Sequence, residues 1–255
     1  MTKTEAFRLI GEIDGRFVEA AQDCAPRKLK RKGRYLRVLA SAAACLVLAA
    51  GILAGVVRYE RAARQIPLVA SSAGVTARYV RKVPDGRSDA SLIGLREDEI
   101  FTRWNTAIFR GTVTGVRNVE IDFAGRKTYR AIARIGISSV VRGPYGAGDE
   151  VSVLLPCTVG DGSRAEDCDV AGRIRAGVEG IFMPIVYDDE NNFFTMNGVT
   201  LDQRDLAPCG LADGMRWAFL DDGRGVCYDE SAFPSLAGVT GLDGVEAFLR
   251  EKAGS

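Results

Sequence analysis

Histidine is absent from all 255 residues of the chain, which excludes every reaction that depends on imidazole. Imidazole is the general base of Ser-His and Cys-His nucleophile pairs and a ligand in many zinc sites. A serine activated by a lysine remains available as a nucleophile. The candidates are Ser138 or Ser139 with Lys127. No surrounding motif supports this pair, so no catalytic residue is predicted.

Carboxylates gather in two short segments. Asp188, Asp189 and Glu190 form one group, and Asp161, Glu166, Asp167 and Asp169 form the other. Oxygen clusters of this kind can hold Ca²⁺, but the Asp, Asn and Gly spacing of a calcium loop is not matched. Acidic side chains are also common at exposed turns. We therefore interpret both groups as solvated loops and predict no metal and no cofactor.

Four of the six cysteines lie in the C-terminal part of the chain: Cys157, Cys168, Cys209 and Cys227. An even number of cysteines in an exported domain is typical of disulfide pairing. The pairs Cys157–Cys168 and Cys209–Cys227 are favoured because each closes a local loop. The alternative is a four-thiolate zinc site, which usually contains close Cys-x-x-Cys pairs that this sequence lacks.

The cysteines can be assigned to compartments because of an apolar run. Residues 38–57 contain 20 amino acids without a charge, between Arg37 and Arg58. A helix rises 1.5 Å per residue, so this run would span roughly 30 Å, the thickness of the hydrocarbon core of a bilayer. Lipid offers no partner for backbone polar groups, so a spanning segment must be helical. The run predicts one transmembrane helix.

Charges on the two sides of this run predict its orientation. Seven cations and no acid immediately precede it, namely Arg27, Lys28, Lys30, Arg31, Lys32, Arg34 and Arg37, whereas Arg61, Arg64 and Glu60 follow Arg58. Cations are retained in the cytoplasm, so the N-terminus is predicted inside and the C-terminal part outside. A leader of 37 residues favours an uncleaved signal-anchor over a cleaved signal peptide. The predicted location is the bacterial cell membrane, with a single pass.

The N-terminal arm contains the pattern of an amphipathic helix. Thr2 and Glu5 have the spacing of a capping box, and Leu9, Ile13 and Phe17 recur every four residues on one face. An isolated helix of this length is marginally stable in water, so its apolar face needs a partner. Two partners remain open: a cytosolic protein, or the inner leaflet of the bilayer next to the basic residues.

Short runs with a period of two dominate the C-terminal part. Residues 58–95 are rich in Ser, Gly, Asp and Arg and predict a linker, with one short strand near 75–83. Strands are predicted at residues 106–116, 128–141, 150–155, 180–187, 192–197, 215–220 and 225–228, and short helices at 97–105 and 244–252. This pattern predicts a mainly β domain, a small antiparallel barrel, at residues 96–255. The predicted organisation is 1–37 arm, 38–57 transmembrane helix, 58–95 linker and 96–255 outer domain.

Two resemblances follow from these features. The order of a short helix centred on Ile13-Asp14-Gly15, a basic block and an Ala- and Cys-containing apolar run resembles a group of bacterial single-pass membrane proteins, and more loosely membrane-bound anti-sigma factors. The zinc-binding His and Cys motif of many anti-sigma domains is absent. Residues 108–116, 129–143 and 148–155 resemble secreted bacterial OB-like barrel modules, which implies an OB-like outer domain.

These observations favour a membrane-anchored, extracytoplasmic binding or signalling module without catalytic activity. The alternatives are an exported hydrolase that uses carboxylates and an anti-sigma-type transmembrane regulator. The expected partners are the lipid bilayer, a cytosolic protein at the N-terminal helix and an outer ligand of unknown type. No nucleic acid is expected, because the sequence contains no stripe of alternating aromatic residues and cations.

Overall fold

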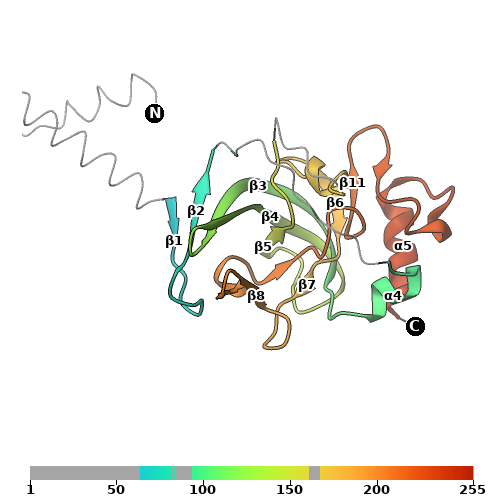
Figure 1. Ribbon diagram of the computed structural model, residues 1–255. Coiled ribbons are helices and arrows are strands. Elements are labelled where there is room, and N and C mark those ends of the chain that lie inside the picture. Colours follow the sequence, from blue (N-terminus) through green and yellow to red (C-terminus); the bar gives the residue numbers. More distant parts are fainter. Residues whose placement is uncertain (1–63, 82, 84–93, 161–166, 255) are drawn as a thin grey trace, which may run out of the picture. The chain divides into compact units, whose positions relative to one another are not determined.

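The computed structural model describes residues 64–81, 83, 94–160 and 167–254. Residues 61–255 form one compact unit. The described residues are mainly β, with a ten-stranded sheet that curls into a half-barrel (Figure 1). Its strands are β1 (Gln65–Ile66), β2 (Val75–Val80), β3 (Ile108–Phe123), β4 (Arg126–Arg142), β5 (Glu150–Leu155), β6 (Glu179–Phe182), β7 (Ile185–Val186), β10 (Cys209–Gly210), β11 (Ala218–Asp221) and β12 (Val226–Cys227).

The strand order along the sheet is β12-β11-β6-β3-β4-β5-β10-β7. In addition, β2 pairs with the C-terminal half of β3, and β1 pairs with β2. All pairs are antiparallel except β5 and β10, which run parallel. A bridge between Thr106 and Ile185 also joins β7 to the residues just before β3. A separate hairpin, β8 (Phe193–Met196) with β9 (Val199–Asp202), completes the β structure.

β3 and β4 form a long hairpin at the centre of the strand order. Ala124 and Gly125 connect the two strands with positive φ angles of 51° and 98°, the conformation of a type I′ turn. The Gly125 amide also donates to the Asp122 carboxylate at 2.6 Å. Residues 118–123 of β3 alternate polar and apolar side chains, so they continue the strand beyond residue 116 and pair with β2.

Two apolar cores lie on this sheet. The larger core includes side chains of β3, β4 and β5 and the buried residues of α4 (Glu97–Thr102) and α5 (Gly241–Ala253). The smaller core lies between β1, β2, the far end of β3 and the β8–β9 hairpin. α5 buries Leu242, Val245 and Leu249, the spacing of one helix face. Two 3-10 turns, η1 (Ala171–Arg173) and η3 (Pro234–Leu236), also pack in the larger core.

The fold class predicted from the sequence needs correction in two respects. The expected small barrel is instead a ten-stranded half-barrel sheet with one parallel pair, because β3 and β4 reach 16 and 17 residues and recruit β1 and β2. Second, no helix in the described part of the chain is long and apolar enough to cross a membrane, so the transmembrane helix is not supported. α5 has 13 residues and spans only about 20 Å. Residues 38–57 lie outside the described residues.

Candidate functional site: a cationic surface on β2, β3 and β4

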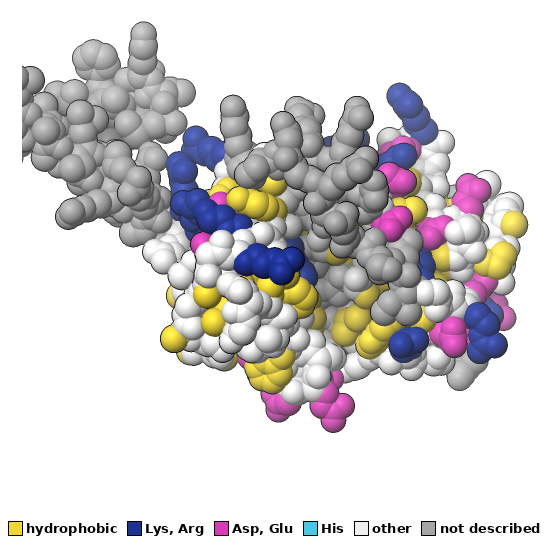
Figure 2. Space-filling view, viewed as in Figure 1, with side chains coloured by type: hydrophobic (Ala, Val, Ile, Leu, Met, Phe, Trp, Pro, Cys, Tyr) yellow, Lys and Arg dark blue, Asp and Glu magenta, His cyan; other side chains and the backbone are white. Residues whose placement is uncertain are grey.

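The far end of the β2–β3–β4 ribbon carries an excess of positive charge. Over residues 78–81 and 117–127 the chain has five cations and two acids. We call the five cations the cationic end: Arg78, Arg81, Arg117, Arg126 and Lys127. Figure 2 shows Lys and Arg side chains gathered over the end of the sheet where β2 and β3 lie in Figure 1. The pairing of β2, β3 and β4 places these residues along the same part of the sheet although they are up to 49 positions apart in sequence, with Arg78 and Lys127 on the face of Glu120 and Arg117 and Arg126 on the other face.

One buried carboxylate organises part of this surface. Strand register places Glu120 between Arg78 of β2 and Tyr129 of β4. Arg78 Nη2 and Lys127 Nζ lie 2.8 and 3.0 Å from Glu120 Oε1, and the Tyr129 hydroxyl donates to Oε2 at 3.1 Å. Burial opposes ionisation of Glu120, but these hydrogen bonds and the charge of Arg78 outweigh it and hold its pKa below the usual value.

The other three cations have no such counter-charge. Arg81, Arg117 and Arg126 are exposed and form no ion pair with any residue that the structure describes. The Arg117 guanidinium lies 3.4 Å from the centre of the Tyr79 ring, a cation–π contact that orients it without neutralising it. These three guanidinium groups are therefore free to contact an external anion.

Arg130 of β4, which is not part of the cationic end, is partly buried. The Arg130 guanidinium lies 5.1 Å from the centre of the Phe194 ring, and its Nη1 donates to Gln203 Oε1 at 3.3 Å. The Tyr187 hydroxyl donates to the same oxygen at 3.3 Å. Burial lowers the pKa of the Arg130 guanidinium. This contact with Gln203 ties β4 to the chain after β9, so its role is in the packing of the smaller core.

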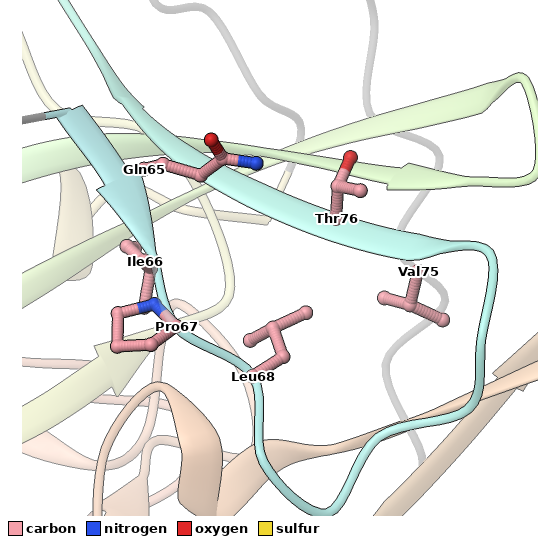
Figure 3. A pocket seen from close by; sticks show the side chains of 6 residues that line it. All are labelled: Gln65, Ile66, Pro67, Leu68, Val75 and Thr76. Carbon is pink, nitrogen blue, oxygen red and sulfur yellow. The ribbon is translucent and has the colours of Figure 1, made fainter. Parts of the chain in front are cut away.

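A shallow apolar pocket adjoins the cationic end. It has a volume of about 410 Å³ and is lined by residues of β1, β2 and the turn between them (Figure 3). Gln65 on its rim pairs across the strands with Arg78. Its walls are Ile66, Pro67, Leu68 and Val75, with Thr76 and Gln65 as the polar members. None of the six lining residues is ionisable. The neighbouring residue Val69 is 89% exposed.

The serine–lysine pair considered from the sequence is not assembled. Lys127 pairs with Glu120 at the start of β4, whereas Ser138 and Ser139 lie near its other end. Ser138 donates to the Arg110 carbonyl at 3.2 Å and Ser139 to Glu246 Oε1 at 2.8 Å. Eleven residues of extended strand separate lysine and serine by roughly 36 Å.

None of the predicted disulfide partners is bonded in the structure, where all four cysteines are free thiols. Cys157 and Cys168 both lie in the larger core. Cys209 in β10 donates to the Ser152 carbonyl at 3.5 Å, whereas Cys227 lies in β12. These two strands are far apart in the strand order of the sheet, so the local pairing of Cys209 with Cys227 is not assembled.

In the first acidic segment, two carboxylates have local roles. The Asp188 carboxylate accepts from the backbone of Glu190 and Asn191 at 2.9 and 3.2 Å and so shapes its own turn. Asp189 pairs with Arg204 at 2.8 Å. In the described ranges no group of three metal-ligating side chains comes together. Asp161 and Glu166 lie outside them.

The residues predicted to set the topology and to bind a partner also lie outside the described residues. They are Arg27, Lys28, Lys30, Arg31, Lys32, Arg34 and Arg37, and the helix face Leu9, Ile13 and Phe17. Neither the cationic end nor the pocket was predicted from the sequence. The cations are distant in sequence, and only the pairing of β2, β3 and β4 places them along the same part of the sheet.

The described residues thus define a mainly β domain with a half-barrel sheet and a cationic end beside an apolar pocket. Comparison of the chain with protein-family models, with curated proteins and with solved structures found no match. What the domain binds therefore has to be inferred from its own charges and contacts.

Proposed function

We propose that the domain of residues 61–255 is a binding module without catalytic activity, and that its cationic end contacts an anionic phospholipid surface. The observation that supports this most directly is the presence of three exposed arginines, Arg81, Arg117 and Arg126, that form no ion pair within the described ranges. Guanidinium groups match the geometry of phosphate oxygens. A basic residue near an anionic bilayer contributes about 1 kcal/mol of binding.

The apolar pocket supports a lipid surface over a soluble anion. Gln65 on its rim is paired with Arg78 of the cationic end, so the pocket adjoins the strand that carries this end. Exposed apolar side chains such as Val69 gain free energy when they enter the interface between headgroups and acyl chains. A phospholipid surface offers both kinds of contact.

Vesicle binding by residues 61–255, which form one compact unit, tests the proposal. We expect binding to phosphatidylcholine vesicles that contain phosphatidylglycerol, and weaker binding as salt screens the charges. The triple variant Arg81→Gln, Arg117→Gln and Arg126→Gln should lose about 3 kcal/mol, or roughly 100-fold in affinity. The measurement is co-sedimentation over a range of lipid concentrations.

A matched control removes the same charge elsewhere. Arg103, Arg175 and Arg224 are exposed, so their joint replacement by Gln should leave vesicle binding within about twofold of the original, since charges beyond a Debye length of about 8–10 Å contribute little. Equal binding to neutral vesicles, or an equal loss in the control, would contradict the proposal. Displacement by soluble polyphosphate with no preference for vesicles would assign the surface to a free phosphate polymer instead.

A further inference from the structure

The hairpin of β8 and β9 has one covered edge and one uncovered edge. On the β9 side, the Ser72 amide donates to the Thr200 carbonyl at 2.8 Å, and the Thr200 amide donates to the Ser72 hydroxyl at 3.2 Å. The Asp202 amide donates to the Ser71 hydroxyl at 3.0 Å. The backbone groups of Thr200 and Asp202 therefore point away from β8, and the turn before β2 covers this edge.

The register of the hairpin shows that the outer edge of β8 is unpaired. Thr195 pairs with Thr200, and Phe193 pairs with Asp202. In an antiparallel pair, two opposite residues point their N–H and C=O groups either toward each other or both outward. Phe193 and Thr195 thus point theirs outward, and these groups have no backbone partner in the ranges that the structure describes. We call the outward N–H and C=O groups of Phe193 and Thr195 the open edge.

The side chains along the open edge are accessible, and the hairpin behind it is fixed. Thr195 is exposed, and Phe193 is 55% exposed. On the opposite face of β8, the centre of the Phe194 ring lies 5.6 Å from that of Phe123. Asn197 Nδ2 donates to the Phe123 carbonyl at 3.0 Å. These contacts hold the open edge in position before any partner binds, which lowers the entropy cost of binding.

Native proteins usually protect an unpaired strand edge, and β8 lacks most of the usual devices. Charged side chains, proline and β-bulges prevent pairing between two edges. Residues 191–201 contain no charge and no proline, although 26% of the chain is charged. The register between β8 and β9 is regular from end to end. The open edge is therefore suited to accept another extended strand.

We propose that the open edge pairs in antiparallel orientation with the open edge of a second copy of this chain, which forms a dimer with a continuous four-stranded sheet. A two-fold axis at Phe194 places Phe193 of each copy opposite Thr195 of the other, so their outward groups form four backbone hydrogen bonds. An aromatic side chain then lies across from a β-branched one, which is a favourable pair. No residue of the cationic end takes part.

The charges around β8 favour a second copy as the partner. In this register the acidic residues 188–190 lie beyond the paired strands, next to the uncharged turn at residues 197–198 of the other copy. Like charges therefore do not meet across the interface. Residues 71–72 cover the outer edge of β9 in both copies, so the sheet closes at two copies instead of growing into a filament.

Sedimentation equilibrium of residues 61–255, which form one compact unit, tests the proposal. The interface is small, so we expect a weak dimer with a Kd on the order of 100 µM. The average mass should rise from about 1.2 to about 1.8 times that of the monomer between about 20 µM and 1 mM. A domain that stays monomeric over this range would overturn the proposal.

Two variants and a matched control identify the edge. Thr195→Pro removes an outward N–H group, and Phe193→Lys places a charge beside the open edge, so each should weaken dimerisation at least tenfold, a rough estimate for blocked edges. Ala176→Lys adds the same charge at another exposed position and should leave the Kd within about twofold. A dimer that tolerates Thr195→Pro would not be held by strand pairing, which would contradict the proposal.

Amide hydrogen exchange of the unaltered domain gives a second measurement that no variant's folding can affect. The Phe193 and Thr195 amides are unpaired in the monomer and bonded in the dimer. Their exchange should therefore slow about fourfold between about 20 µM and 1 mM, whereas that of the Phe194 amide, which faces β9, should not change. Protection that requires an added peptide of alternating valine and threonine would assign the edge to a foreign strand and overturn the proposal.

Discussion

At the scale of single residues, Glu120 decides how much charge the cationic end presents. Its one carboxylate accepts from Arg78, Lys127 and Tyr129. Two of the five cations are thereby engaged, and the remaining three guanidinium groups form no ion pair in the described part of the chain. The surface contains ion pairs, but its cations outnumber its acids, and it therefore keeps a net positive charge.

Replacing Glu120 by Gln should change the stability of the fold and its vesicle binding in different directions. Glu120→Gln should lower the free energy of unfolding at pH 7 by about 1 kcal/mol, since its partners are about half exposed to solvent and screen the pairs. The same change increases the positive charge of the surface, so vesicle binding should be at least as strong as before. Urea unfolding and co-sedimentation measure the two effects. Weaker vesicle binding by the folded variant would contradict the proposed role of charge.

The pH dependence of this effect follows from the lowered pKa of Glu120. A carboxylate whose folded pKa is depressed stabilises the fold in full above its ordinary value, near 4.5, and loses this contribution as pH falls through the lower folded value. The difference in stability between the original chain and Glu120→Gln should therefore be constant from pH 6 to 7. Below pH 4.5 it should shrink. A difference that grows on acidification would contradict the assignment.

At the scale of elements, the long β3–β4 hairpin positions the surface. The sequence predicts strands at 106–116 and 128–141, and the structure extends both toward the Ala124-Gly125 turn. Alternation at Val119, Ile121 and Phe123 was present in the sequence as a signal for this extension. The sequence did not show that these three side chains are buried in the smaller core, because that core also needs β2 and the β8–β9 hairpin.

Close contact between these strands depends on one glycine. A Cβ on Gly111 would lie 2.5 Å from the Gly136 carbonyl oxygen across the hairpin, where the register also shifts. Gly111→Ala should therefore lower the free energy of unfolding by about 2 kcal/mol through overpacking. Gly172→Ala is the control, because a Cβ there meets no atom within 4 Å, and it should change stability by less than about 0.5 kcal/mol. Equal effects in urea unfolding would contradict this explanation.

At the scale of the whole molecule, charge is distributed unevenly. The cationic end lies with β1 and β2 on one side of the sheet, and α4 and α5 lie on the other (Figure 1). The second side carries Arg110, which links β3 to Glu179 at 2.7 Å and to Asp243 of α5 at 2.5 Å. Arg110 is thus neutralised within the fold.

The location of this domain remains a prediction, which rests on the seven cations of residues 27–37. If residues 96–255 lie outside the cytoplasm, an added protease should degrade this domain in intact cells and spare an N-terminal tag. Immunoblots against both ends of the chain measure this outcome, with a cytosolic protein as the control for intact cells. Protection of the domain until the cells are lysed would contradict the predicted location.

By itself, the sequence determined which chemistry is excluded and which elements form. The absence of histidine removes imidazole mechanisms, and the period-two runs predict most strands because side chains alternate across a sheet. Residues 222 and 223 also predict the β11–β12 hairpin correctly. These inferences succeed because they depend on residue types and on neighbours in the sequence.

Tertiary structure alone decided which distant residues share a surface or a core. It placed Arg78, Glu120 and Tyr129 side by side and kept Cys209 apart from Cys227. It also replaced the expected small barrel by a ten-stranded sheet. The physical reason is that strand register and strand order depend on how side chains distant in sequence pack in both cores. A short stretch of sequence does not specify that packing.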